Sequence, residues 1–436
     1  MKNKSCRILA RDQTVSNDTW TTGLNNNDLI IGPSGSGKTR GYVLPNLLQS
    51  GESLVITDTK GNLCAQIGPV LEGRGYTVLE INLADCVSSP YGYNPLDYIR
   101  VINGRCHEQD VMTAAAALVP LENQRDPYWE LAARSMLTGI IAYVMERLPY
   151  GERTMSSVTR LFREMGTGRF DQLMSEVSEI DPECLAAVQY QMFLMTQKAE
   201  KMYASVQGIL AEKLSPFSFS GVLALMNHPQ KISLSRIGER KTAVFLHISD
   251  TDRSMDRLAT LFYTQALHVL CGSADKRKNN RLKVPVRLIL DDFAAGADSC
   301  IPDFDKIISV IRSREISVSV ILQSLSQLEA SYGHNKAMTI VNNCDHLLYL
   351  GGQDVETARY IATKANKSVN TVLNMPLDDA WLFTRGEAPK AVQKYDLKEH
   401  PLYRRMQRLA LKRERELREL EKLIIEDETE FCELPF

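Results

Sequence analysis

The sequence predicts an α/β protein in which an all-α insertion interrupts a mostly parallel central sheet. Two observations support this prediction. Short β-branched and leucine-rich runs recur along the chain, each bounded by turn residues and separated by helical stretches. Between about residues 150 and 227, however, only helical spacing of apolar residues occurs. Strands that are apolar on both faces and alternate with helices are typical of a parallel sheet covered on both sides.

Eight strands are expected in the sheet, because each is a short apolar run that ends at turn residues. They are Leu29–Ile31, Leu54–Thr57, Thr77–Ile81, Ala243–Ile248, Arg287–Leu290, Val318–Leu322, His346–Leu350 and Trp381–Phe383.

The insertion is expected to start after Pro149 and to end at His228-Pro229. Its apolar residues recur at helical spacing, for example Val158, Leu161 and Met165. Residues 151–235 contain eight Lys/Arg and nine Asp/Glu, so the charge of the insertion does not itself predict nucleic-acid binding.

A helical tail is expected from residue 401 to 436. Six of its residues fall at alternating spacings of four and three, as in a coiled-coil seam: Met406, Ala410, Arg413, Leu417, Leu420 and Ile424. Two interpretations stay open. The helix packs on its own domain, or it binds a partner.

Composition excludes several classes of protein. A hydrophobic fraction of 44% and a formal net charge of −2 are ordinary for a globular protein and give no global basic field. The nine cysteines form no CxxC pair, which argues against zinc and disulfides and favours reduced thiols in the cytosol. No stretch reaches the roughly 18 to 20 apolar residues of a membrane helix, and the N-terminus lacks a signal-peptide core.

The strongest chemical signal is a phosphate-binding loop. Gly32-Pro33-Ser34-Gly35-Ser36-Gly37-Lys38-Thr39 matches G-x-x-x-x-G-K-[ST], follows the apolar run Leu29–Ile31 and precedes a helical stretch. Backbone N–H groups of such a loop cradle phosphates at a helix N-terminus. Lys38 is expected to reach the β- and γ-phosphates of ATP, and the Thr39 hydroxyl to bind Mg²⁺. Pro45 is expected to bend that helix or end it early.

An acidic pair completes the expected site. Asp291 and Asp292 follow the apolar run Leu288–Leu290, where the carboxylates of such a strand bind Mg²⁺ and orient or deprotonate the attacking water. Asp292 stands where many P-loop motors have Glu. Because Asp is shorter by one C–C bond, about 1.5 Å, hydrolysis is expected to be slow or to need a neighbouring subunit.

Three further polar residues are candidates for catalysis. Gln323 follows the strand Val318–Leu322, where such ATPases place a sensor of the γ-phosphate; alternatively it only caps the strand. Arg312 and Arg314 precede that strand. They are either surface residues or arginine fingers that reach the ATP of a neighbour in a ring.

An ordered series of motifs resembles the type IV secretion coupling proteins, the TraG/TraD-type ATPases of conjugative plasmids and transposons. The resemblance covers roughly residues 25 to 400. Its motifs are Gly32–Arg40 with Pro45–Leu48, Thr57–Leu63, Tyr93–Leu96, Asp126–Glu130, Leu290–Ala294, Ile301–Lys306, Ile311–Glu315, Leu322–Leu328, Asn343–Asp345 and Leu350–Gly352.

This resemblance implies a RecA-like P-loop NTPase domain with an inserted all-α domain, assembled as a homo-hexamer. It also implies a relaxase–DNA substrate that is recruited and passed to the secretion channel by ATP hydrolysis. The implied domains are residues 1–149 and 228–400 for nucleotide binding, 150–227 for the insertion and 401–436 for the tail. By position, Gly32 to Arg40 bind nucleotide, Thr39 and Asp291 bind Mg²⁺, and Asp292, Gln323 and Arg312 act in catalysis.

The sequence departs from this family at two places. The usual N-terminal membrane helices are absent, so membrane contact is expected only through partners or a missing anchor, at the inner face of the bacterial plasma membrane. The family usually has Asp-Glu where this chain has Asp291-Asp292. Two alternatives therefore stay open: a cytoplasmic DNA translocase of the FtsK/HerA type, and a docking platform that binds ATP but hydrolyses it weakly.

Overall fold

The computed structural model describes residues 5–121, 127–165, 167–196, 200–296 and 299–432, around a nine-stranded central sheet. The strand order is β13-β12-β11-β3-β10-β9-β4-β8-β5. Pairs from β11 to β5 are parallel, whereas β12 and β13 are antiparallel additions at one edge. The strands are β3 (Asp28–Ile31), β4 (Ser53–Asp58), β5 (Thr77–Asn82), β8 (Thr242–His247), β9 (Val286–Leu290), β10 (Ile316–Leu322), β11 (His346–Tyr349), β12 (Asp379–Thr384) and β13 (Lys390–Gln393).

All eight predicted strands lie in this sheet, so the expected mostly parallel sheet is confirmed. Strand β13 was not predicted. It has only four residues, of which Lys390, Ala391 and Gln393 are exposed, and therefore it lacks the apolar run of the buried strands. Such a short, charged strand is a common way to end the edge of a sheet.

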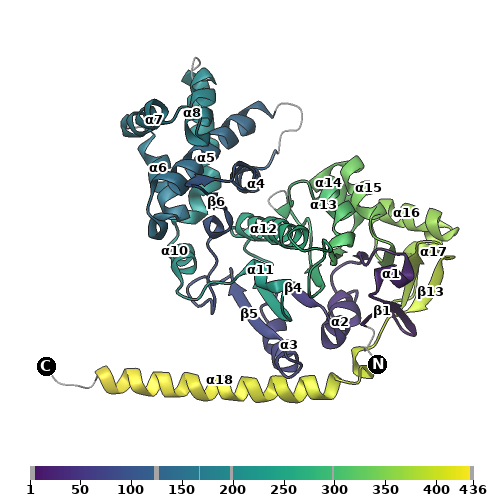
Figure 1. Ribbon diagram of the computed structural model, residues 1–436. Coiled ribbons are helices and arrows are strands. Elements are labelled where there is room, and N and C mark those ends of the chain that lie inside the picture. Colours follow the sequence, from purple (N-terminus) through teal and green to yellow (C-terminus); the bar gives the residue numbers. More distant parts are fainter. Residues whose placement is uncertain (1–4, 122–126, 166, 197–199, 297–298, 433–436) are drawn as a thin grey trace.

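Helices cover both faces of the sheet (Figure 1), and the residues of β3 illustrate how the two cores are divided. Leu29 and Ile31 belong to one hydrophobic core and Ile30 to another, since successive side chains of a strand point to opposite faces. Helices α2 (Leu44–Gln49) and α3 (Leu63–Glu72) pack in the core of Ile30. The helices in the other core include α12 (Asp256–Asp275), α13 (Phe304–Val310), α14 (Leu325–Tyr332), α15 (His334–Asn342), α16 (Val355–Ala365) and α17 (Val369–Leu373).

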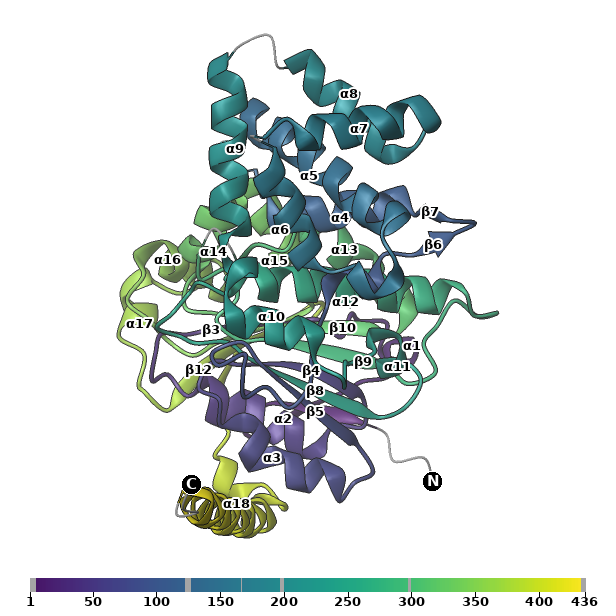
Figure 2. The ribbon, with the colours of Figure 1, turned by 90° about the vertical axis from the view of Figure 1, so that its left-hand side faces the viewer.

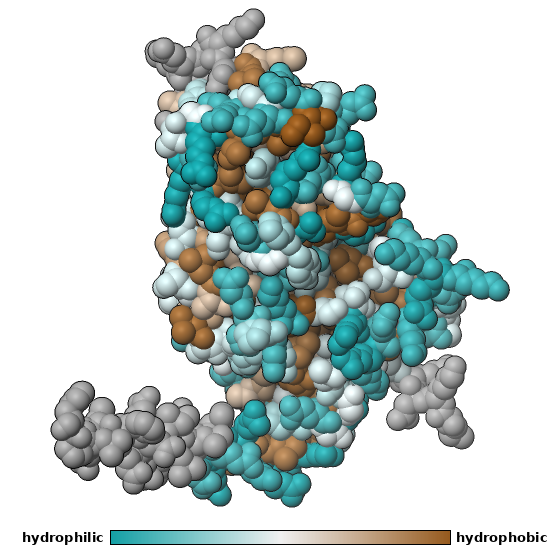
Figure 3. All heavy atoms as spheres, turned by 60° about the vertical axis from the view of Figure 1, so that its left-hand side comes forward, coloured by the Kyte–Doolittle hydropathy of each residue, from teal (hydrophilic) through white to brown (hydrophobic). Residues whose placement is uncertain are grey.

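A helical region stands at one end of the molecule (Figure 2). Its helices are α4 (Glu108–Leu118), α5 (Tyr128–Arg147), α6 (Met155–Glu164), α7 (Arg169–Ile180), α8 (Leu185–Thr196), α9 (Glu200–Leu214) and α10 (Ser220–Asn227). No strand occurs between 150 and 227 in the part of the chain that the structure describes. Several large apolar side chains remain exposed here, including Ile180 and Met195, and Figure 3 shows hydrophobic patches on this end.

The helical region is not limited to residues 150–227. Helix α5 precedes residue 150, yet it packs closely on α8: Ser135 Oγ donates a hydrogen bond to Gln189 Oε1 at 2.5 Å. A Cβ atom on Gly139 would lie 3.4 Å from the Gln189 Cβ, so the two helices approach closely. The domain limits drawn from the sequence therefore stay a prediction.

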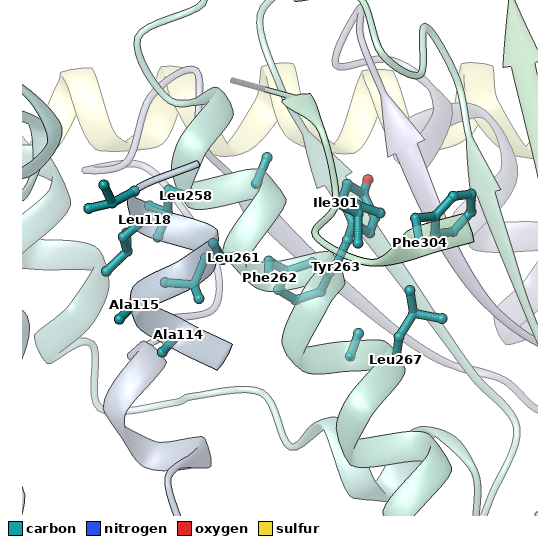
Figure 4. Packing of buried hydrophobic residues seen from close by; sticks show 14 of the residues in the cluster. Ala114, Ala115, Leu118, Leu258, Leu261, Phe262, Tyr263, Leu267, Ile301 and Phe304 are labelled. Atoms are coloured by element: carbon teal, nitrogen blue, oxygen red, sulfur yellow. The ribbon is translucent and has the colours of Figure 1, made fainter. Parts of the chain in front are cut away.

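Helix α4 connects this region to the sheet. Figure 4 shows Ala114, Ala115 and Leu118 of α4 facing Leu258 and Leu261 of α12. The small alanine side chains allow the two helices to lie near each other. Helix α12 in turn packs on the sheet, which places a continuous apolar core between the helical region and the strands.

Residues 6–22 form structure that was not predicted. Strands β1 (Cys6–Ala10) and β2 (Gln13–Ser16) form an antiparallel hairpin, followed by the short helix α1 (Thr19–Thr22). Arg7 on β1 is fully buried and donates to the Asp28 carboxylate on β3 at 2.7 Å. Two other short elements also escaped prediction, the β6–β7 hairpin (Val101–Ile102 and Arg105–Cys106) and α11 (Leu234–Ile237).

Pro45 does not end its helix early, and the expected bend stays a prediction. The helix after the phosphate loop continues past Pro45 to Gln49. Residues Thr39–Val43 instead form a π-turn, in which the N–H of Leu44 bonds to the carbonyl of Thr39. Pro45 then occupies the first turn of α2, where a missing N–H and a fixed φ are tolerated.

The predicted helical tail is confirmed as α18 (Tyr403–Cys432), while residues 433–436 lie outside the described part. Figures 1 and 2 show α18 leaving the body of the protein beside α3. Its start packs on that body, because Met406 is buried and Arg405 lies against Gly73. Its role in partner binding stays a prediction. Among the described helices, no single one is long and apolar enough to cross a membrane, although the bent pair 203–218 and 220–227 passes by length and composition.

Candidate nucleotide-binding site

The phosphate loop lies between β3 and the π-turn, at the carboxyl edge of the sheet. Gly35 and Gly37 have φ values of +79° and +96°, a backbone region that L side chains rarely adopt. Gly32 has a different reason to be glycine, because a Cβ there would lie 2.4 Å from Ser36 Oγ. The glycines of the motif therefore allow a tight, inward-turned loop.

Lys38 is held inside this loop. Its Nζ donates to the carbonyl oxygens of Gly32 at 2.7 Å and Pro33 at 3.1 Å, and the residue is buried. The hydroxyl oxygen of Ser36 is also buried and has no hydrogen-bond partner. A buried hydroxyl without a partner is costly, so a ligand oxygen in the loop would relieve that cost.

The acidic pair lies on the same edge of the sheet. Strand β10 lies between β3 and β9, and the N–H of Gly32 donates to the carbonyl of Leu322 at 3.0 Å. The carboxyl ends of β3, β10 and β9 thus bring Lys38, Gln323 and Asp291 together. Ligands of open parallel sheets bind at this edge.

Asp291 is poised to receive a cation. Burial, with the neighbouring Asp292 charge, raises the pKa of Asp291 to about 6, although Lys38 and the N–H of Asp292 act in the opposite direction. The Thr39 hydroxyl, Asp291 and nucleotide oxygens are hard oxygen donors of the kind that Mg²⁺ takes, usually with several waters retained. The residues present therefore fit a nucleotide-bound Mg²⁺. No cluster of three or more His, Cys, Asp or Glu side chains suited to a metal occurs within the described ranges.

Asp292 and Gln323 contact each other. Gln323 Nε2 donates to Asp292 Oδ1 at 3.4 Å, so the predicted sensor and the predicted catalytic acid are neighbours. Asp292 has a φ of +49°, in the left-handed region that Asp and Asn adopt more readily than other side chains. The backbone at this position therefore favours the shorter acid over Glu.

Arg312 and Arg314 do not join this constellation. They precede β10, at the amino edge of the sheet, whereas the phosphate loop follows the carboxyl end of β3. Arg312 donates to the carbonyl of Thr19, and Arg314 makes a two-pronged contact with Asp275 at 2.8 and 3.1 Å. Within one copy of the chain, neither arginine approaches the phosphate loop.

A cleft of about 590 Å³ opens beside the loop, within the range of small-molecule sites. Arg40 and the loop residues line one side. The other sides are lined by apolar residues and glycines, such as Leu350, Gly351 and Met375, and also by the polar residues Gln353, Asp378, Lys394 and Asp396. This mixture suits a nucleoside attached to phosphates. No individual residue after 372 was predicted to line the nucleotide site, since nothing local marks these residues as part of a phosphate site.

A second, much smaller cavity lies behind the acidic pair. It has a volume of about 40 Å³ and is lined by Asp291, Asp292, Thr57 and Arg253, among others. Arg253 Nε donates to the buried Asp256 at 2.7 Å. No motif in the sequence marked Arg253, which comes from the loop between β8 and α12.

Comparison with known proteins agrees with this geometry. Residues 2–373 match the family described as Type IV secretory system Conjugative DNA transfer. The chain is 22% identical over 344 residues to protein VirD4 of Rhizobium radiobacter, which covers 78% of this chain and 48% of that protein. It is 24% identical over 368 residues to conjugal transfer protein TraG of Escherichia coli, covering 78% and 57%. The chain spans about half the length of these relatives.

Solved structures show the same fold. The bacterial conjugative coupling protein TrwBΔN70, in complex with sulphate, superposes with a TM-score of 0.65 at 19% identity over 85% of both chains. VirB4 of Thermoanaerobacter pseudethanolicus gives a TM-score of 0.56 at 15% identity, over 91% of this chain and 97% of that one. The RecA-like P-loop NTPase fold expected from the sequence is thereby confirmed. Since the family match extends over most of its length, this protein belongs to the type IV secretion family of conjugative DNA transfer proteins.

Proposed function

We propose that this chain is the ATP-hydrolysing coupling protein of a conjugative type IV secretion system. In this role it recruits a relaxase–DNA substrate and drives its transfer with ATP. One observation carries the proposal: Lys38, Asp291, Asp292 and Gln323 come from three neighbouring strands and meet at one edge of the sheet. TrwB, which has the same fold, has been solved with the ATP analogue ADPNP and with ADP and Mg²⁺.

The proposed roles follow from position. The backbone of Gly32 to Arg40 binds the phosphates, and Lys38 leaves the Gly32 and Pro33 carbonyls to contact the β- and γ-phosphates. Thr39 and Asp291 hold Mg²⁺, which neutralises phosphate charge when bound. Asp292 orients or deprotonates the attacking water, and Gln323 senses the γ-phosphate through its contact with Asp292.

The proposed assembly is a homo-hexamer that acts with DNA, a relaxase and the secretion channel. Arg312 and Arg314 lie at the amino edge of the sheet, so a role as arginine fingers requires the site of a neighbouring copy. We place the protein at the inner face of the plasma membrane, held there by partners or by an anchor. The near-neutral insertion is more suited to a protein partner than to bare DNA.

A weakly hydrolysing docking platform is a second candidate, and one contact favours it. The hydrogen bond from Gln323 occupies one oxygen of the short Asp292 carboxylate and restricts its orientation. Asp292 is then less able to activate a water molecule. A chain that binds ATP tightly but shows no turnover with any DNA would support this candidate.

The main test measures ATP turnover with and without single- and double-stranded DNA, at two salt concentrations, together with particle mass. We expect DNA to stimulate hydrolysis, and DNA binding to weaken steeply with salt because phosphate contacts release counterions. Lys38→Ala should lower turnover by about 100-fold or more. Lys390→Ala is the matched control, since Lys390 is exposed and paired with Glu387. Unchanged turnover in Lys38→Ala would refute the proposal.

A further inference from the structure

A lysine from outside the family-matched residues reaches the phosphate loop. Lys394 follows β13, beyond residue 373 where the family match ends. Its Nζ donates to the carbonyl oxygen of Ser36 at 3.0 Å, across 358 positions of sequence. Its own N–H donates to the carbonyl of Asp378, which fixes the segment in place. The chain next to it lies against the helix after the loop, because a Cβ on Gly41 would be 3.5 Å from the Tyr395 carbonyl.

Lys394 is a partly buried cation without a paired anion. It makes no salt bridge to any carboxylate among the residues that the structure describes. Burial lowers the pKa of Lys394, although the charges of Asp378 and Asp379 partly oppose this shift. The Ser36 carbonyl uses one of its three N–H donors, so others remain for a ligand. A cation in such a position is stabilised by an anion placed in the adjoining cleft.

The location of Lys394 indicates which part of a nucleotide it would meet. The acidic pair follows the carboxyl end of β9, which β10 separates from β3, and it marks the γ-phosphate end of a triphosphate lying along the loop. The cleft of about 590 Å³, lined by Lys394, Arg40 and Tyr395, opens beside the loop and does not include the acidic pair. The nucleoside end therefore points into this cleft, and the phosphate nearest to it is the α-phosphate.

We propose that Lys394 is a nucleotide-binding residue that contacts the α-phosphate. Residues 375–378 and 394–397, which lie outside the family-matched residues and line the cleft, then complete the nucleotide site of this chain. This assignment rests on the proposed function of the phosphate loop. It differs from a purely structural role, in which Lys394 only props the loop through Ser36.

The experiment compares Lys394→Met with the wild type by calorimetric titration of ATP, ADP and inorganic pyrophosphate in the presence of Mg²⁺. Methionine keeps an unbranched stem of similar length but removes the charge. We expect the affinities for ATP and ADP to fall by the same factor, about tenfold, since both contain an α-phosphate. Pyrophosphate, which we expect in the β and γ positions beside Lys38 and the acidic pair, should bind unchanged. Lys394→Arg should restore most of the affinity, and the exposed control Lys390→Met should behave as wild type.

Each outcome decides between the possibilities. An unchanged ATP affinity in Lys394→Met would overturn the assignment. An equal loss for ATP and pyrophosphate would also overturn it, because Lys394 would then only support the shape of the loop. A wild-type protein that binds no nucleotide would instead refute the proposed function. These failures are distinguishable, since the first two require that the wild type binds ATP.

Discussion

Two aspartates at opposite edges of the same sheet, the buried Asp28 and the half-buried Asp291, have opposite electrostatic surroundings. Asp28, at the amino end of β3, accepts hydrogen bonds from Arg7 at 2.7 Å and Tyr42 at 2.5 Å, and Arg287 lies 3.5 Å away. Burial alone would raise the pKa of Asp28, but the two arginines lower it below its ordinary value. At the carboxyl edge, burial and the neighbouring Asp292 raise the pKa of Asp291 to about 6.

The difference separates a structural charge from a functional one. The amino edge pairs its buried charges internally, since Glu52 also neutralises Arg287 at 2.9 Å, although Arg287 Nη2 has no hydrogen-bond partner. The carboxyl edge leaves a carboxylate without enough positive charge, at the place where a bound cation would supply it. Strongly shifted carboxylates in a cleft are typical of functional sites. The comparison therefore assigns stability to one edge and ligand binding to the other.

The largest expected change in the free energy of unfolding comes from a substitution at the amino edge. Asp28→Asn leaves Arg7 buried without its counter-charge and Arg287 with only Glu52. Removing one partner of a buried ion pair costs about 3–5 kcal/mol, so the free energy of unfolding in urea should fall by that amount. The control is Asp303→Asn, which breaks an exposed pair with Lys306 and should leave the free energy of unfolding nearly unchanged. A loss below about 1 kcal/mol for Asp28→Asn would show that this network is not structural.

At the carboxyl edge, removing the charge of Asp291 is expected to raise the free energy of unfolding instead of lowering it. Because the folded pKa of Asp291 lies above its unfolded value near 3.8, its ionisation opposes folding increasingly as the pH rises from about 4 to 6. Asp291→Asn should therefore raise the free energy of unfolding at pH 7 by about 1–2 kcal/mol, discounted for partial exposure. At pH 4 the gain should disappear. A variant destabilised at pH 7 would contradict the interpretation that this charge is unsatisfied, and ATP turnover should be lost in either case.

The sequence could predict the site residues that belong to local patterns, but not those that only the folded chain brings to the site. The loop Gly32–Thr39 and the acids after β9 are local patterns, so both were predictable with their chemistry. The sequence also indicates that Arg312 precedes a parallel strand and therefore lies at the amino edge of the sheet. From there Arg312 could reach only the ATP of a neighbouring subunit. Lys394 was not predictable, because its proximity to Ser36 arises only when β13 joins the far edge of the sheet. The exposed β13 lacks the apolar run that marked the other strands.

The smallest effect concerns Mg²⁺ binding. If Asp291 holds the metal, it must be deprotonated, and a pKa of about 6 makes the ionised fraction fall from nearly all at pH 7.5 to about a quarter at pH 5.5. The affinity for Mg²⁺ in the presence of ADP should then drop about fourfold between these pH values, beyond the protonation of the nucleotide itself. The variant Asp291→Asn measures the contribution of the nucleotide alone, since ADP still titrates in this variant but the carboxylate of residue 291 is absent. A wild-type profile parallel to that of the variant would show that Asp291 does not titrate in this range. The contrast with Asp28 would then depend on burial alone and would no longer identify the carboxyl edge as the metal site.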